Sequence, residues 1–311
     1  MILKIVLNKA YRLVIDNEHR KYRLSAKDDG NVYFVIRRRR PGTAGICSLI
    51  YTAMGGFAYS DENRYIPYVD LLNDKSIYTQ NGQNGWDIFF EQVNGNQEIN
   101  DRLIKSAKNV IVGGHYSDYR LPSAKVMFSK NELEYWHNIY KTYFKFSNKM
   151  KSRINTKYRS KVNKNDRVLG VLCRGTDYLA MKPSNHTIQP DPIEVLNRSR
   201  NAFLKYDCNK IWLATEDVNI FKMFKDVFGD SLLAVSEDFV NYNYRWGGDL
   251  ANYIGEQMNV INNGLDYLTS IYALSQCDCL IAGLTNGSLV SSIMSNNDYD
   301  YYYYYDLGLY P

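Results

Sequence analysis

The chain of 311 residues lacks a paired-cysteine motif, a long hydrophobic run and a strong excess of either charge. None of its five cysteines forms a C-x-x-C pair, so we expect reduced, mostly buried thiols and a reducing compartment. Cys277 and Cys279 lack the further ligands that a zinc site needs. No run is long and apolar enough to span a bilayer, and the charged residues 1–15 do not resemble a signal peptide.

The charge balance is only mildly basic. Lys and Arg number 38 against 33 Asp and Glu, which gives a formal net charge of +5. This excess is too weak to indicate nucleic acid, but it suits an anionic substrate or an anionic membrane surface. With 45% hydrophobic residues the chain can bury sizeable cores, and its length predicts roughly two domains at about 150 residues each.

Residues 2–15 are predicted to form a basic amphipathic helix. Apolar residues recur at helical spacing, while Lys4, Lys9 and Arg12 fall on the remaining face. Such a helix either packs on its own domain or lies on an anionic membrane surface, and both interpretations stay open.

The first half of the chain predicts the start of a Rossmann-like unit. A β-rich run at 31–36 precedes a glycine-bearing loop at 41–45 and a helix at 46–63. The loop does not match G-x-G-x-x-G, so a dinucleotide is not indicated. Further on, residues 86–92 set aromatics beside acids, which is typical of a sugar site but also of a core segment, and a long helix is predicted over 127–150.

The second half alternates strands and helices. Apolar runs predict strands at 168–172, 210–214, 231–235 and 279–282, and amphipathic runs predict helices at 192–206, 217–228, 265–276 and 288–294. This rhythm indicates a parallel sheet with right-handed crossovers. The polar linker 161–166 is the predicted boundary between domains 1–160 and 161–311. The tyrosine-rich tail forms a last strand, stays mobile, or packs back on the first domain.

Three predicted strands of the second half end in polar loops. The loops contribute Arg174, Gly175, Thr176 and Asp177, then Thr215, Glu216 and Asp217, and finally Thr285, Asn286, Gly287 and Ser288. Carboxyl ends of parallel strands meet at one edge of a sheet, where ligands bind. Arg174 and the donors at a helix N-terminus suit a phosphate, although the arginine could instead pair with a carboxylate. Glu216 and Asp217 cap their helix, or their backbone reads a nucleotide base.

These loops resemble the motifs of the GDP-fucose-dependent fucosyltransferases, the superfamily of the core α1,6- and nodulation fucosyltransferases, and especially its bacterial surface-polysaccharide members. The likeness extends to the run Lys182-Pro183, His186 and Gln189-Pro190, to residues 84–92, and to the glycine loop 41–45. It is strong over 168–290 and touches about 36–310.

The resemblance implies an α/β protein of GT-B architecture, with two Rossmann-like domains facing a central cleft. The first domain would lie on the acceptor side and the second would hold the nucleotide sugar, including a contact from Asp266. The implied activity is inverting transfer of fucose from GDP-fucose, without a metal, to a hydroxyl of a glycan or lipid-linked oligosaccharide in surface polysaccharide synthesis. We expect a cytoplasmic protein, peripheral at the inner face of the membrane, that binds no nucleic acid.

Arg174 matches the family arginine that neutralises the leaving diphosphate, but other positions depart from the pattern. Gly175 stands where relatives carry a second arginine and Leu172 where they carry a histidine. Ser270 replaces an aspartate, with Asp266 one turn earlier, and Lys182 lies near the position of the catalytic carboxylate.

The general base is therefore open. Asp177, His186 and Glu91 are candidates, and Asp177 is expected rather to brace Arg174. Two alternatives follow from the departures: a GT-B transferase that uses another nucleotide sugar, or an inactive nucleotide- or sugar-binding protein.

Overall fold

The computed structural model describes residues 20–22, 29–37, 44–73, 76–94, 97–113, 119–175, 179, 182–235 and 259–311. The helix predicted over residues 2–15 lies outside these ranges. The described chain forms two compact units. The first contains the described residues up to 37 and residues 52–121, and the second contains residues 44–51 and the described residues from 122 onward.

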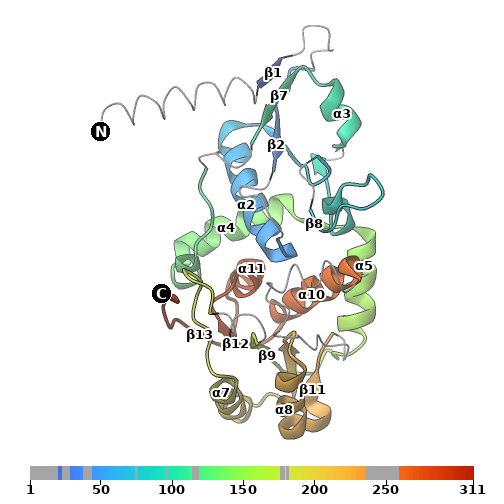
Figure 1. The fold of residues 1–311 in the computed structure, drawn as a ribbon. Coiled ribbons are helices and arrows are strands. Elements are labelled where there is room, and N and C mark those ends of the chain that lie inside the picture. Colours follow the sequence, from blue (N-terminus) through green and yellow to red (C-terminus); the bar gives the residue numbers. More distant parts are fainter. Residues whose placement is uncertain are drawn as a thin grey trace, which may run out of the picture. The chain divides into compact units, whose positions relative to one another are not determined.

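The first unit is built on a four-stranded sheet in the order β1-β7-β2-β3 (Figure 1). β2 runs parallel to both β3 and β7, and only β1 at the edge is antiparallel. The elements are β1 (Arg20–Tyr22), β2 (Tyr33–Ile36), α2 (Ile46–Asn63), β3 (Ile66–Val69), η1 (Gly85–Ile88), β4 (Phe90–Glu91), β5 (Val93–Asn94), β6 (Gln97–Glu98), α3 (Asp101–Ser106) and β7 (Asn109–Val112).

Both faces of β2 are covered, which explains its unbroken apolar sequence. On one face Phe34 packs on Tyr59 of α2, with ring centroids 5.0 Å apart. On the other face Tyr33 and Val35 belong to a cluster with Ile104 of α3. All four β2 residues are buried, so the strand forms the centre of this unit.

The second unit contains a five-stranded sheet in the order β11-β10-β9-β12-β13, and every pair in it is parallel. Its elements are η2 (Ala124–Phe128), α4 (Lys130–Tyr143), β8 (Lys145–Phe146), α5 (Asn148–Ile154), η3 (Asn155–Arg159), β9 (Val168–Leu172), α7 (Pro192–Lys205), β10 (Lys210–Ala214), α8 (Val218–Phe228), η4 (Gly229–Ser231), β11 (Leu232–Leu233), α10 (Val260–Leu274), β12 (Cys279–Gly283), α11 (Asn286–Ser295) and β13 (Tyr301–Tyr305).

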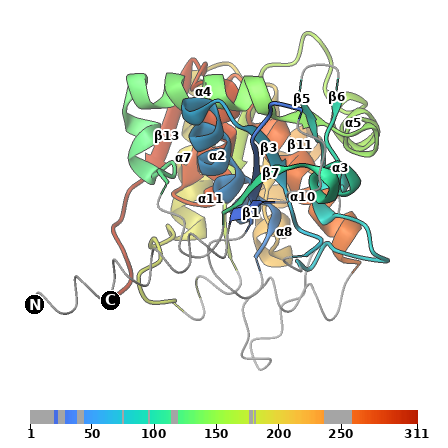
Figure 2. The ribbon, with the colours of Figure 1, turned by 90° about the horizontal axis from the view of Figure 1, so that it is seen from above.

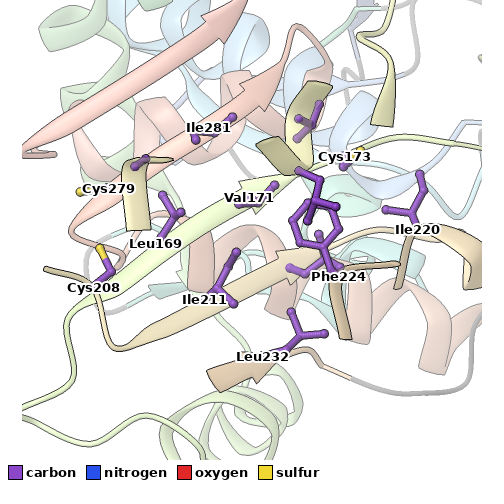
Figure 3. Packing of buried hydrophobic residues seen from close by; sticks show 14 of the residues in the cluster. Leu169, Val171, Cys173, Cys208, Ile211, Ile220, Phe224, Leu232, Cys279 and Ile281 are labelled. Carbon is purple, nitrogen blue, oxygen red and sulfur yellow. The ribbon is translucent and has the colours of Figure 1, made fainter. Parts of the chain in front are cut away.

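Alternate residues of β9 face different helices. Leu169 and Val171 pack with Phe224 of α8 and with residues of α7 on one face of the sheet (Figure 3). The opposite face is covered by α10, which packs against β9 and β10 (Figure 1). At Gly170 an added Cβ would stand only 3.0 Å from Cys277 Sγ, so glycine allows the close approach of the chain that follows α10. The predicted alternation of strands and helices in this half is confirmed.

The prediction of one long helix over residues 127–150 is wrong, because the helical backbone is interrupted at two places. The backbone is extended at Ser129 (φ −125°, ψ 111°) and again at Phe144 (φ −96°, ψ 99°). Ser147 then caps the next helix by accepting a hydrogen bond from Met150 N at 3.1 Å. Serine competes for backbone hydrogen bonds and favours such caps over helix interiors.

The observed division of the chain also differs from the boundary predicted at 161–166. α4 packs against α11, and α5 packs against α10 (Figures 1 and 2). Both helices therefore group with the second unit, and the division falls near residue 121 rather than 160.

The tyrosine-rich tail forms the edge strand β13, parallel to β12. Tyr304 is buried, and its hydroxyl lies 2.6 Å from Ser292 Oγ in α11 and 2.8 Å from Asn297 Oδ1. Of the three alternatives for the tail, the prediction of a last strand is therefore confirmed.

All five cysteines are free and buried, as expected. Along the described parts of the chain no helix combines the length and the apolar character needed to cross a bilayer.

The burial of β12 predicts a large cost for truncating Ile281, which is fully buried. Ile281→Ala should lower the free energy of unfolding by about 2–5 kcal/mol, because it leaves a cavity in a close-packed core. Urea unfolding followed by circular dichroism measures this loss. Ile193→Ala is the matched control, since Ile193 is 61% exposed and its loss should change stability by no more than about 0.5 kcal/mol. Equal losses for the two variants would contradict the assigned core.

Candidate functional site

The three polar loops of the second unit converge as predicted. Leu172, at the end of β9, lies opposite Ala214 of β10 on one side and Ala282 of β12 on the other. The three strands therefore end at one level, and the loops that follow them share the carboxyl edge of the sheet. This edge is where open α/β sheets bind ligands.

Arg174 is held by Glu216 across two of these loops. Its Nε donates to Glu216 Oε1 at 3.0 Å, and the same oxygen accepts the backbone N–H of Gly175 at 3.0 Å. The side chains of Arg174 and Glu216 are each only 14% exposed, so the guanidinium is held in a partly desolvated environment. The bracing carboxylate is thus Glu216. Thr176 and Asp177 lie outside the described residues, and the bracing role of Asp177 stays a prediction.

Asp217 is the N-cap of α8, which confirms one of the two predicted roles for this pair of acids. Its Oδ1 accepts from the backbone N–H of Asn219 at 2.8 Å and of Ile220 at 3.4 Å. Thr215 Oγ1 accepts in turn from Asp217 N at 3.2 Å. These contacts order the second loop against its own helix.

Gly175 lies directly against this cap. A Cβ at position 175 would stand 2.5 Å from Asp217 Oδ2, closer than any unstrained contact. The second arginine that the resemblance places here therefore has no room while Asp217 caps α8. The packing of the first loop against the second therefore explains why this chain has glycine, and not the second family arginine, at position 175.

The third loop begins α11 with a reciprocal capping box. Thr285 Oγ1 accepts from Ser288 N at 3.1 Å, and Ser288 Oγ accepts from Thr285 N at 2.8 Å. Both hydroxyls, predicted to face a ligand, thus hold the helix end. The first N–H groups, on Asn286 and Gly287, are among those that a helix leaves without intrahelical acceptors, and they lie at its positive end.

Sequence reasoning missed Tyr267 of α10 and Cys47 of α2. A Cβ at Gly287 would stand 2.7 Å from the Tyr267 hydroxyl, so this hydroxyl lies at the start of α11. Burial raises the pKa of the Cys47 thiol to about 12, although a hydrogen bond with Tyr267 and the charge of Arg174 oppose the rise. These contacts bring the first turn of α2 close to Arg174, and no motif in the sequence signals them.

Asp266 directly precedes Tyr267 in α10, but its side chain contacts α5 rather than the start of α11. Its Oδ1 lies 3.4 Å from Arg153 Nε, and Arg153 also donates to Asn262 Oδ1 at 2.8 Å. The carboxylate predicted to contact the nucleotide therefore forms an ion pair with α5.

His186 lies in an exposed loop that the C-terminal tail holds. Its Nδ1 is 3.1 Å from Ser184 O, and its carbonyl accepts from Tyr310 N at 2.8 Å. Ile188 N donates to Gly308 O at 2.9 Å. Residues 186–188 are thereby held in place by residues 308–310.

This held loop also supports the third strand-end loop. The Thr187 hydroxyl donates to Leu284 O, and Gln189 Nε2 donates to the same carbonyl at 3.1 Å. Leu284 directly precedes Thr285, so the segment 187–189 positions the start of α11.

Glu91 belongs to the first unit, where it is half-buried at the end of β4. The aromatics beside it are core residues: Trp86 and Phe90 stack with centroids 4.6 Å apart and are 1% and 0% exposed. Asp87, rather than Glu91, accepts from Gln92 Nε2 at 2.8 Å, and partial desolvation raises the pKa of Asp87 to about 6. The segment therefore offers acids but no exposed tryptophan face for a sugar.

Within the described ranges, no cluster of three or more His, Cys, Asp or Glu side chains could hold a metal ion. In the part of the chain that the structure describes, the carboxyl edge offers the fixed Arg174 guanidinium, the N-terminus of α11 and hydrogen-bonding side chains.

Solved structures of fucosyltransferases share this fold. NodZ alpha-1,6-fucosyltransferase soaked with GDP-fucose aligns with a TM-score of 0.51 and 14% identity, over 85% of this chain and 92% of that one. Fucosyltransferase NodZ from Bradyrhizobium aligns with a TM-score of 0.50 and 14% identity, over 84% and 92%. POFUT1 in complex with GDP-fucose aligns with a TM-score of 0.52 and 7% identity, over 90% and 100%.

No protein-family model and no curated protein sequence matches the chain significantly. The chain has the fold of GDP-fucose-dependent fucosyltransferases, so the predicted GT-B class with Rossmann-like α/β units is confirmed. At identities this low the likeness establishes the fold, and the activity has to be argued from the site.

The contact between Gly175 and Asp217 generates a stability prediction. Gly175→Ala should displace the capping carboxylate and lower the free energy of unfolding by about 1 kcal/mol or more. Chemical denaturation measures the change. Gly45→Ala serves as the control, because a Cβ there meets nothing within 4 Å, and it should be neutral or slightly stabilising. An unchanged midpoint for Gly175→Ala would show that the cap tolerates the added methyl group.

Proposed function

We propose that the protein is a metal-independent, inverting glycosyltransferase that moves fucose from GDP-fucose to a hydroxyl of a glycan. The observation that carries this proposal is the position of Arg174. Glu216 fixes this side chain at the carboxyl edge of the sheet, where α11 begins. Among the structural neighbours, NodZ was soaked with GDP-fucose and POFUT1 was solved with it, which supports the same donor here.

The proposed chemistry requires stabilisation of a leaving diphosphate. The acceptor hydroxyl attacks the anomeric carbon, and the bond between that carbon and the diphosphate oxygen breaks, so negative charge grows on GDP. A guanidinium that is already oriented stabilises this charge without reorganisation, and the N–H groups at the start of α11 add a partial positive charge.

The proton of the acceptor hydroxyl has to pass to a base. Asp177, His186 and Glu91 remain the proposed candidates.

A second proposal is a different nucleotide sugar as donor. The packing of Gly175 against Asp217 favours it, because position 175 has no room for the second arginine that the resembling enzymes carry there. A screen of nucleotide sugars by nucleotide release separates the two donors, and binding without release across acceptors would indicate an inactive binding protein.

The acceptor and the cellular setting are part of the proposal. We propose a glycan or a lipid-linked oligosaccharide acceptor in surface polysaccharide synthesis, and a cytoplasmic protein peripheral at the inner membrane face. Incorporation of labelled fucose from GDP-fucose into lipid-extractable or polysaccharide material tests this setting.

Removal of the fixed cation tests the role of Arg174. Arg174→Ala should weaken GDP binding about 10- to 100-fold, since charged hydrogen bonds are worth about 1.5–3 kcal/mol, and should abolish transfer. Isothermal titration with GDP, GDP-fucose and UDP measures the affinities. Arg200→Ala, at an exposed position of α7, is the matched control and should bind as the wild type does.

Two outcomes would overturn the assignment. Absence of binding of any guanosine nucleotide to the wild-type chain would remove the proposed donor. Full turnover by folded Arg174→Ala would remove its leaving-group role.

The support of α11 by Thr187 gives another prediction. Thr187→Val removes the hydroxyl that donates to Leu284 O, so GDP affinity should fall several-fold, while Thr187→Ser keeps the donor and should restore it. Titration with GDP measures both, and thermal unfolding checks that the two variants are equally folded. Equal affinities for the valine and serine variants would show that this hydrogen bond does not position the site.

A further inference from the structure

The positive charge of the chain is concentrated in one short segment. Residues 145–164 contain eight Lys or Arg and no Asp or Glu. The excess of the whole chain is only +5, so the rest of the chain is net negative. A mildly basic protein thus carries a strongly basic segment, and the proposed transfer reaction makes no use of it.

The middle of the segment is one helical stretch, α5 followed by the π turn η3, with Lys145 in β8 just before it and Lys164 a few residues after it. Met150, Ile154 and Tyr158 are 0%, 3% and 8% exposed and form its inward face. α5 packs on α10 with this face (Figures 1 and 2). The cations are therefore displaced to the outer side of the stretch and to its ends.

Five of the cations define what we name the α5–η3 basic surface. These residues are exposed and follow one another along the stretch: Lys145, Lys149, Lys151, Arg159 and Lys164. Three of the eight cations are left out. Lys157 is only half-buried rather than exposed, Arg153 pairs with Asp266 at 3.4 Å, and Lys161 Nζ donates to Ala234 O at 2.7 Å. Asp266, the acid that α10 turns toward this stretch, is thus already engaged.

We propose that the α5–η3 basic surface binds the surface of an anionic lipid bilayer. Four of its five members are lysines, whose long stems let the ammonium groups reach lipid phosphates from a helix that lies along the surface. Clusters of four to eight basic residues attract anionic bilayers in this way. Binding should therefore weaken steeply with added salt.

The same residues fit a nucleic acid less well. Single-stranded nucleic acids stack their bases on exposed aromatic side chains. Tyr158 is buried in the core, and its ring packs edge-on against Trp212 with centroids 5.2 Å apart. The exposed residues between the cations are Ser, Asn and Thr, and Phe146 is half-buried with its ring edge-on against Tyr272, so this stretch offers no exposed stacking platform.

The experiment is flotation of the full chain with vesicles of phosphatidylcholine, with and without phosphatidylglycerol. The wild type should float only with the anionic vesicles and dissociate at high salt. A variant with Lys149→Gln, Lys151→Gln, Arg159→Gln and Lys164→Gln should bind at least about tenfold more weakly, because each cation contributes separately. The control carries Lys125→Gln, Lys141→Gln, Arg200→Gln and Lys222→Gln, four exposed positions outside the surface with the same loss of charge.

Wild-type affinity in the control and lost affinity in the surface variant would support the proposal. Equal affinities of the two variants would overturn it, as would failure of the wild type to float with phosphatidylglycerol vesicles. Tighter binding of a duplex oligonucleotide than of vesicles, with the same dependence on the four residues, would assign the surface to nucleic acid instead. GDP titration of both variants keeps this test separate from the proposed function, since neither set of substitutions touches the strand-end loops.

Discussion

The contact of Glu216 with two loops is the interaction on which the candidate site depends. One carboxylate oxygen accepts from the guanidinium of Arg174 and from the backbone of Gly175. It can do so because β9 and β10 are neighbouring parallel strands that end at the same level. A partly desolvated cation is stabilised by pairing, so Glu216 of the second loop offsets the cost of desolvating Arg174 in the first loop.

The close packing of the loop after β9 against the loop after β10 also determines which side chains fit at the carboxyl edge. Asp217 caps α8 and fills the space above Gly175, so position 175 has no room for an arginine. The rest of the positive potential comes from the start of α11, whose hydroxyl side chains cap the helix and leave its backbone N–H groups toward the edge. In the proposed reaction, the Arg174 guanidinium and the N-terminus of α11 are the described groups that would hold the diphosphate.

Remote parts of the chain hold this arrangement in place. The tail pairs with the loop around His186, and that loop donates through Thr187 and Gln189 to Leu284, just before α11. The α5–η3 basic surface belongs to the same compact unit but uses other residues. The proposed donor binding and the proposed attachment to an anionic surface therefore rest on different residues.

The sequence by itself determined the elements whose burial is complete. The runs at 168–172 and 211–214 are apolar throughout because both faces of the sheet are covered, and the predicted strands 168–172 and 210–214 match the structure residue for residue. Even the convergence of the three polar loops followed from the rule for parallel strands. Tertiary structure alone decided that Glu216 braces Arg174 while its neighbour caps a helix, and that the segment 127–150 breaks twice. Both outcomes depend on partners far along the chain, which a local pattern of residues does not contain.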